Sequence, residues 1–471
     1  MNTRNLFFFI ALFTSISVFS QSIKLDKALG KENAKMVVET MGIYQDMKMT
    51  NYVKSVGDRL VSHLDNPLFE YQFHIIPDMS PNAFALPGGY IYITTGLLPL
   101  LASEDELACI IGHEIIHSNN RHSVKQLKKK ILPSLLEIPG ELLGVVNENL
   151  GTLFNAPLKV SNSLLFASYG RKSETEADNE GIKLAAKAGY DPKAMSPTLI
   201  RLSKTIEVTT DNKEEKSYFN DHPYTPERTA NIDEILVGLS WKKTAPISNN
   251  FLFEFDNLLF GTDPKQGVIM DNKFLHPALD FYIEFPKGWE IDNQSTNVGA
   301  YQSDKKAAAF VYVEDNSISP KKTGTTFVEN LSSKDKSKMI SQEVSSLNGK
   351  ESYLVTFKEI IKSEAVFAYI LWTPLNGKLL KLVGVGSSQY KTTLERVSHS
   401  LRPLTNKDKA SIKINKVRVV EARQGETITT LSKRLNNQLN IELTGIINDK
   451  SVTEKLDKGT LIKVVNEQNY Y

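Results

Sequence analysis

The chain has 471 residues, too many for one ordinary core, and its length is typical of about three domains. Hydrophobic residues make up 41% of it and charged residues 23%, which excludes a disordered or fibrous chain. The 56 basic and 54 acidic residues leave a formal net charge of +2, so no global field attracts nucleic acid or an anionic membrane.

The N-terminus has the three-part layout of a secretory signal peptide. Arg4 supplies a positive charge, an apolar run extends from Leu6 to Val18, and Ser20 precedes a possible cut before Gln21. Because the run is too short for a comfortable membrane span, we expect a cleavable signal over residues 1–20 and an exported protein, periplasmic or secreted, with no transmembrane span after cleavage. An uncleaved anchor is the alternative.

The next part of the chain alternates helical and strand patterns. Apolar spacing predicts helical structure over about residues 24–64, then a strand over 71–76. Residues 82–94 read as a hairpin around Pro87-Gly-Gly89. Ser103 and Glu106 form a capping-box pattern, in which Ser103 caps the N–H of Glu106 and the Glu106 side chain reaches back. A further helix is expected over 172–188.

The helix that opens at Ser103 carries the strongest chemical signal. His113 and His117 are four residues apart, so both imidazoles project from one helix face and can bind one metal ion. Glu114 lies beside that face, where its carboxylate can take a proton from a water at the metal. This pattern predicts a zinc-dependent peptidase with one Zn²⁺ per chain.

Several residues are candidates for the third ligand. A metzincin arrangement is excluded, because Asn120 and Ser123 stand at its Gly and His positions. A thermolysin-like arrangement would use Glu137, which Pro139 follows closely. Glu174 and Asp178 are four apart on the later expected helix, so one carboxylate can bind zinc while the other orients a ligand histidine.

Several motifs, in the same order along the chain, resemble the HtpX/CAAX prenyl protease family of gluzincin metallopeptidases. These are Asn82-Ala-Phe-Ala-Leu-Pro-Gly-Gly89, Gly96-Leu-Leu98, Ser103-Glu-Asp-Glu-Leu107, His113-Glu-Ile-Ile-His117, Arg121-His122, Glu174-Thr-Glu-Ala-Asp178 and His222-Pro-Tyr-Thr-Pro-Glu-Arg228.

The resemblance, over about residues 24–235, implies zinc ligands His113, His117 and Glu174, with Glu114 as catalytic base and Asp178 behind the ligands. Its soluble periplasmic, BepA-like branch is the most similar one and is linked to envelope protein quality control.

Two further features bear on catalysis. His222 is expected to stabilise the oxyanion or to fill the fourth zinc position in a resting state. Tyr90, Ile91 and Tyr92 are expected to form an edge strand that accepts an extended substrate by backbone pairing.

The rest of the chain is expected to contain further modules. After a peptidase domain over 22–237 we expect a polar linker over 238–275 and a small α+β domain of unknown role over 276–404. A module over 414–467 resembles LysM segments, which implies contact with peptidoglycan. No ligand or base lies beyond residue 404, so removal of that part is expected to spare peptide cleavage.

The sequence therefore predicts an α+β chain with a mainly helical zincin-type catalytic domain that carries a small hairpin or sheet. The expected function is a secreted zinc endopeptidase that acts on misfolded or envelope proteins in quality control. The alternative is a non-catalytic periplasmic chaperone or peptidoglycan-binding scaffold with a structural metal.

Overall fold

The computed structural model describes most of the chain, in ranges separated by gaps. The described residues are 23–125, 169–209, 218, 222–246, 251–294, 296–304, 306–314, 319–361 and 363–471. The expected signal peptide and Glu137 lie outside them. The chain forms two compact units. Among the described residues, the first unit draws on the ranges 23–125, 169–261 and 415–468, and the second on 262–414 and 469–471.

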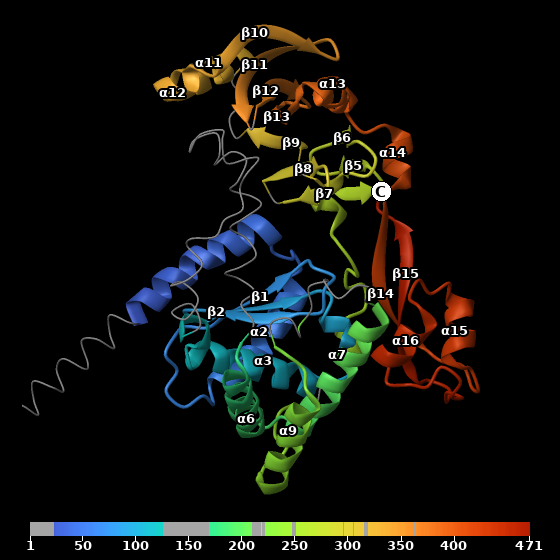
Figure 1. The fold of residues 1–471 in the computed structure, drawn as a ribbon. Coiled ribbons are helices and arrows are strands. Elements are labelled where there is room, and N and C mark those ends of the chain that lie inside the picture. The colour runs from blue at the N-terminus through green and yellow to red at the C-terminus, as the bar shows by residue number, and fades with distance from the viewer. Residues whose placement is uncertain are drawn as a thin grey trace, which may run out of the picture. The chain divides into compact units, whose positions relative to one another are not determined.

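A three-stranded sheet organises the start of the first unit (Figure 1). Its strands are β1 (Gln72–Ile76), β2 (Ala83–Leu86) and β3 (Tyr90–Thr94), in the order β1-β3-β2. β2 and β3 pair antiparallel around Gly88 and Gly89, whose φ angles of 84° and 96° suit residues without a Cβ. The expected hairpin is thus confirmed.

The expectation that β3 is an edge strand is wrong. Tyr90, Ile91 and Tyr92 lie in the central strand, which pairs in parallel with β1 on one side and antiparallel with β2 on the other. Both backbone edges of β3 are therefore used, and an extended substrate has no free edge to join there. The parallel partner comes from upstream of the hairpin, a pairing that the local alternation does not reveal.

Helices cover both faces of this sheet. The expected helical region over 24–64 consists of two helices, one at residues 23–41 and α2 (Met47–Val61). The first helix ends at Gly42, which has a positive φ, and Asp46 is the N-cap of α2. Val37 of the first helix packs with Ile76, Phe84 and Tyr92 on one face. The opposite face packs against α2 and the long helix α3 (Glu104–Asn119).

At the start of α3, one of the two hydrogen bonds of the expected capping box is present. Ser103 accepts a hydrogen bond from Glu106 N–H, so the N-cap is confirmed. The carboxylate of Glu106 instead accepts from Ala102 N–H at 2.7 Å and pairs with buried Arg201 at 2.6 Å. The tertiary partner Arg201 draws the carboxylate away from the cap.

Further helices accompany α3 in the first unit. They are η1 (Leu98–Leu100), α6 (Arg171–Lys187), η2 (Pro192–Ala194), α7 (Met195–Thr209), α9 (Pro226–Gly238) and α10 (Phe251–Glu254). Phe251, Phe255 and Leu258 are buried in the same core as α3. The centre of the expected linker over 238–275 is therefore a packed part of the first unit, because its aromatic residues complete that core.

The C-terminal segment of the first unit shares this core. It consists of β14 (Lys413–Glu421), α15 (Ile428–Leu435), α16 (Ile441–Ile447) and β15 (Leu461–Asn469), with β14 and β15 paired. Its buried residues Val417, Leu443, Ile447 and Val465 belong to the same cluster as the residues of α3. The Lys463 ammonium group, buried at 1% exposure, donates to Leu101 O at 2.7 Å, just before α3.

The second unit is dominated by an antiparallel seven-stranded sheet in the order β10-β11-β12-β13-β9-β8-β7. Its strands are β7 (Glu290–Asn293), β8 (Asn297–Tyr301), β9 (Ala307–Glu314), β10 (Met339–Leu347), β11 (Lys350–Ile361), β12 (Glu364–Leu375) and β13 (Lys378–Ser387). The helices are η3 (Pro264–Gln266), α11 (Pro320–Glu329), α12 (Ser333–Lys336), η4 (Ser388–Tyr390), α13 (Lys391–Ser400) and α14 (Asn406–Ser411).

A smaller sheet accompanies the large one in the second unit. It consists of β4 (Val268–Met270), β5 (Lys273–His276) and β6 (Phe281–Glu284). Phe274 and Ile283 pack with residues of the seven-stranded sheet in one buried cluster.

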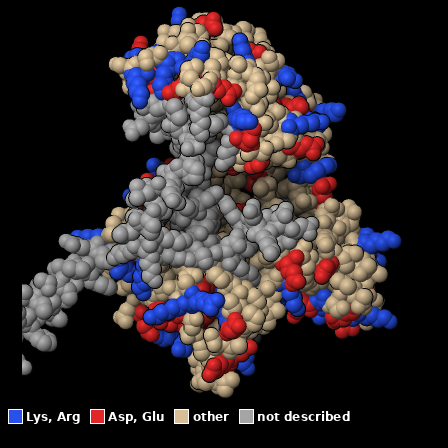
Figure 2. Space-filling model, in the orientation of Figure 1, with Lys and Arg blue, Asp and Glu red and all other residues tan. Residues whose placement is uncertain are grey.

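The described surface carries mixed charge. On the face shown in Figure 2, basic and acidic side chains are interspersed, as the near-balanced composition predicts. None of the helices in the described ranges combines the length and apolar character that crossing a bilayer requires.

The shared core changes the expected effect of truncation. Deleting residues 415–471 removes Val417, Leu443, Ile447 and Val465 and uncovers the apolar surface that they bury. Each buried aliphatic side chain is worth about 1.5–3 kcal/mol, against a total stability of about 5–15 kcal/mol. We therefore expect the truncated chain to unfold at much lower urea concentration, measured by circular dichroism, and to lose any activity with its fold. An unchanged unfolding midpoint of the peptidase region would contradict the shared core.

The buried Lys463 predicts a pH-dependent stability. Burial lowers the pKa of this lysine to about 7, against the pull of Glu106, whereas an unfolded lysine titrates near about 10.4. From about pH 7 to about pH 9 only the unfolded chain holds this proton, so the destabilisation due to burying it is progressively relieved as pH rises. We expect the stability of wild type relative to Lys463→Met to increase by roughly 2 kcal/mol over that window, measured by urea unfolding. Parallel pH profiles for the two proteins would refute this.

Candidate metal centre

The metal centre begins on α3, where every residue from Glu106 to Ser118 is buried. A helix that is enclosed on all sides is part of the core, so its polar side chains need internal partners. His113 and His117 are both fully buried, and their Nε2 atoms lie 2.9 Å apart. The expected spacing thus brings the two imidazoles together.

A close approach of two helices brings the carboxylates to these histidines. α6 packs against α3 where Gly112 faces Gly181, and a Cβ at Gly181 would lie 2.9 Å from the backbone N and Cα of His113. Only residues without a side chain permit this separation. Glu174 then reaches the pair, with Oε1 3.3 Å from His117 Nε2 and Oε2 3.7 Å from His113 Nε2.

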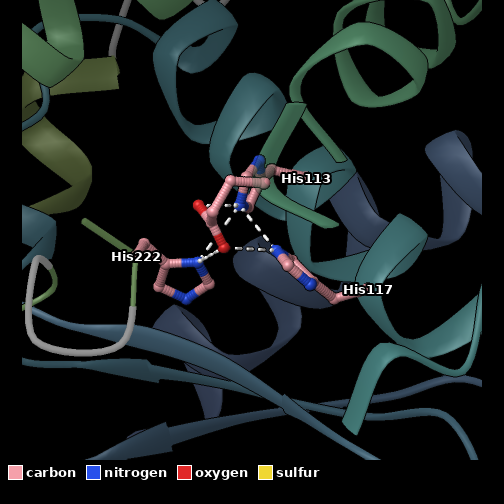
Figure 3. A group of neighbouring side chains, drawn as sticks. His113, His117 and His222 are labelled. Carbon is pink, nitrogen blue, oxygen red and sulfur yellow. Dashed lines mark hydrogen bonds and ion pairs between the residues drawn. The ribbon is translucent and has the colours of Figure 1, made fainter. Parts of the chain in front are cut away.

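A third imidazole enters from the segment just before α9. His222 is fully buried, and its Nδ1 lies 3.2 Å from His113 Nε2 and 3.1 Å from Glu174 Oε1. The ligand atoms of His113, His117, Glu174 and His222 all fall within 4.8 Å of one another. Figure 3 shows the three histidine rings turned toward one another, with dashed lines to the carboxylate.

The protonation states of this cluster favour a bound cation. Burial lowers the pKa of His113 and, more strongly, of His117, where the neighbouring His113 adds to the effect. Burial alone would raise the pKa of Glu174, but the charge of His222 and the hydrogen bonds from His117 and His222 hold it well below its usual value. The neutral ring nitrogens of His113 and His117 and the ionised carboxylate of Glu174 therefore point their lone pairs into one enclosed space.

Zinc fits this set of donors. Zn²⁺ binds imidazole nitrogen and carboxylate oxygen, and two histidines with one glutamate are a known ligand set for catalytic zinc. Converging lone pairs at about 3 Å repel unless a proton or a metal ion lies between them. The residues present thus suit the expected cofactor, with His222 as a possible fourth donor.

Asp178 fixes the orientation of His113. Its Oδ1 lies 3.0 Å from His113 Nδ1, on the ring edge away from the cluster. Arg228 holds this carboxylate through two hydrogen bonds, of 2.6 Å from Nε and 2.9 Å from Nη2, and also contacts Glu174 at 3.0 Å. Burial would raise the pKa of Asp178, but the charge and hydrogen bonds of Arg228 keep it lowered. The geometry therefore places Asp178 where the sequence expected an orienting carboxylate.

Glu114 lies beside the cluster rather than in it. It is fully buried, and its Oε1 is 3.4 Å from His222 Nε2. Burial would lower the pKa of His222, but the carboxylates of Glu174 and Glu114 raise it to about 9. The two residues proposed to act in catalysis thus face each other next to the ligand atoms.

Sequence reasoning assigned no role in the site to three aromatic or imidazole residues. Tyr169 stacks on His117 with ring centroids 3.9 Å apart, and Tyr218 stacks on His222 at 4.5 Å. His122 Nδ1 lies 3.0 Å from His117 Nδ1. The spacing of four between Tyr218 and His222 was a usable signal, whereas Tyr169 has no neighbouring motif that marks it.

Comparison with known proteins finds a family that part of the chain resembles. Residues 47–236 match the sequence profile described as Peptidase family M48. This range contains all four residues of the cluster, Glu114, Asp178 and Arg228.

Three relatives illustrate the similarity. Mitochondrial metalloendopeptidase OMA1 of Schizosaccharomyces pombe is 28% identical over 46% of this chain and 62% of its own length. Beta-barrel assembly-enhancing protease of Escherichia coli K12 is 26% identical over 44% of this chain and 43% of its own length. Mitochondrial metalloendopeptidase OMA1 of Arabidopsis thaliana is 33% identical over 30% of this chain and 27% of its own length.

The chain thus spans about half the length of the curated relatives that it matches. The profile match covers the region that holds the metal centre. By the profile match, together with relatives named as metalloendopeptidases, residues 47–236 are similar to the metalloproteases of peptidase family M48.

Proposed function

We propose that this chain is a zinc-dependent endopeptidase in which His113, His117 and Glu174 hold the metal and Glu114 is the general base. The observation that carries this proposal is the enclosed cluster of ring nitrogens and an ionised carboxylate, with Glu114 directly beside it. A metal that served only to hold the fold would not need a buried carboxylate next to its ligands.

Each residue then has a chemical task. Bound zinc would act as a Lewis acid toward a peptide carbonyl and a water molecule. Glu114 takes the proton of the attacking water and delivers it to the leaving nitrogen. His222 Nε2 lies 3.4 Å from Glu114 Oε1, beside the ligand atoms, and when protonated it can donate a hydrogen bond to the developing oxyanion.

His222 also supports the second candidate, a scaffold or chaperone with a structural metal. Structural zinc sites are usually closed by four protein ligands, and the cluster here contains four donors. In the enzyme, His222 would be a metal donor only at rest and would leave that position to water and substrate. The two candidates differ in whether Glu114 affects turnover.

The substrate class rests on the relatives and on the N-terminal pattern. One relative is named as a protease that enhances beta-barrel assembly, and residues 1–20 have a signal-peptide layout. Both favour an exported enzyme that removes unfolded or envelope proteins. Contact of the C-terminal LysM-like module with peptidoglycan stays a prediction.

The metal assignment predicts a specific pattern of zinc loss. The purified chain should contain about one zinc per molecule. Alanine at His113, His117 or Glu174 should reduce the zinc content to a small fraction, because each change removes a donor from the cluster. Glu180→Ala, on the exposed side of α6, is the matched control and should keep the metal. Metal analysis of the dialysed proteins measures this, and full zinc content in all three ligand variants would reject the site.

The base assignment predicts that Glu114→Gln separates folding from turnover. Glutamine keeps the size of the side chain and suits a helix, so α3 and the zinc content should be unchanged. Loss of the general base should lower the rate by roughly two to four orders of magnitude. Cleavage of casein by zinc-loaded wild type and variant, with Glu180→Gln as control, measures the effect.

Two outcomes would count against the enzyme. Equal cleavage by wild type and Glu114→Gln would eliminate the mechanism. No cleavage by either protein, with suppression of aggregation of an unfolded client intact in both, would favour the scaffold.

A further inference from the structure

A second buried histidine lies behind the ligand His117. Arg121 adopts a φ of 61°, which ends α3 and turns the chain back, so that His122 faces the helix it has just left. His122 is 2% exposed, and its Nδ1 lies 3.0 Å from Nδ1 of His117. The contact therefore joins the ring edges that face away from the metal cluster.

The direction of this hydrogen bond follows from the metal site. His117 directs Nε2 into the cluster, where it lies 2.9 Å from His113 Nε2. A neutral imidazole that presents its Nε2 lone pair to a metal carries its proton on Nδ1. His117 Nδ1–H then donates to the Nδ1 lone pair of His122, whose own proton must be on Nε2.

A carboxylate stands on the far side of His122. Glu176 Oε2 lies 3.5 Å from His122 Nε2, longer than a formed hydrogen bond, so it acts on the ring mainly through its charge. Asn120, the C-cap of α3, donates to Glu176 Oε1 at 2.7 Å and holds this side chain in place. Glu176 is 35% exposed, so solvent screens its charge in part.

The arrangement parallels the one that holds the other ligand histidine. His113 Nδ1 meets Asp178 at 3.0 Å, and Arg228 fixes that carboxylate. His117 Nδ1 meets His122, and Glu176 lies beyond it. Each ligand ring thus has a partner at its Nδ1 atom. For His113 the partner is a carboxylate, and for His117 it is a neutral imidazole with a carboxylate on its other side.

We propose that His122 is a positioning residue of the metal centre, which accepts the Nδ1 proton of His117 and so holds that ring in its metal-binding tautomer and orientation. Glu176 supports it electrostatically. This inference rests on the proposed function, since it needs His117 to be a ligand. Partners of this kind typically change metal affinity by about 10–100-fold.

The test is a pair of variants that differ in the acceptor alone. In His122→Asn the amide oxygen can occupy the place of Nδ1 and accept the same hydrogen bond, whereas His122→Leu has similar bulk and no acceptor. We expect His122→Leu to weaken zinc binding by about 10–100-fold and His122→Asn by only a few-fold. Glu176→Gln should have a smaller effect than His122→Leu, and Glu180→Gln none.

The measurement is competition for zinc between a chelator of known affinity and the full-length chain. The visible spectrum of the cobalt-substituted protein provides a second readout, because it reports the geometry of the ligands. We expect an altered cobalt spectrum in His122→Leu and a near-native one in His122→Asn. Urea unfolding of the zinc-free proteins shows whether each variant folds.

Three results would overturn the inference. One is wild-type zinc affinity in folded His122→Leu, and another is an equal loss in the Asn and Leu variants, since that would show a packing role. The third applies if zinc-free His122→Leu does not fold. In that case a folded His122→Asn protein that binds zinc as weakly as His122→Leu would contradict the role of the acceptor. Failure of wild type itself to bind zinc would instead reject the proposed function.

Discussion

The contact between α3 and α6 at Gly112 and Gly181 is the constraint on which the metal centre depends. A Cβ on Gly181 would meet the backbone of His113 at 2.9 Å, so any larger residue would push the helices apart. α3 supplies His113, Glu114 and His117, and α6 supplies Glu174 and Asp178. Short carboxylate side chains reach the imidazoles only because the two backbones are this close.

Because the site is buried, the charges of its carboxylates need compensation by positive groups within the protein. Glu114, Glu174 and Asp178 bring three carboxylates into one buried region, and Arg228 and a protonated His222 supply the positive charge that faces them. Buried charges need compensation, because water cannot screen them. A divalent cation among the ligand atoms would take over the role of the His222 proton, which links the packing of the helices to the chemistry of the site.

Local patterns were sufficient for the central residues but not for their surroundings. The i, i+4 spacings of His113/His117 and Glu174/Asp178 indicated one face of a helix each, and the hairpin of β2 and β3 followed from alternation around two glycines. The position of β3 at the centre of its sheet was missed, since its parallel partner β1 lies upstream. The role of His122 was also missed, because a positive φ at Arg121 turns it back onto His117.

The sequence by itself determined which side chains can perform the chemistry and on which helix faces they lie, because residues four apart in a helix project from the same face. Only the tertiary structure decided that Glu174 meets His113 and His117, that His222 joins them, and that Val417 and Val465 complete the core around α3. These contacts join residues that are far apart in the chain. Their formation depends on the packing of whole elements, and no local pattern encodes it.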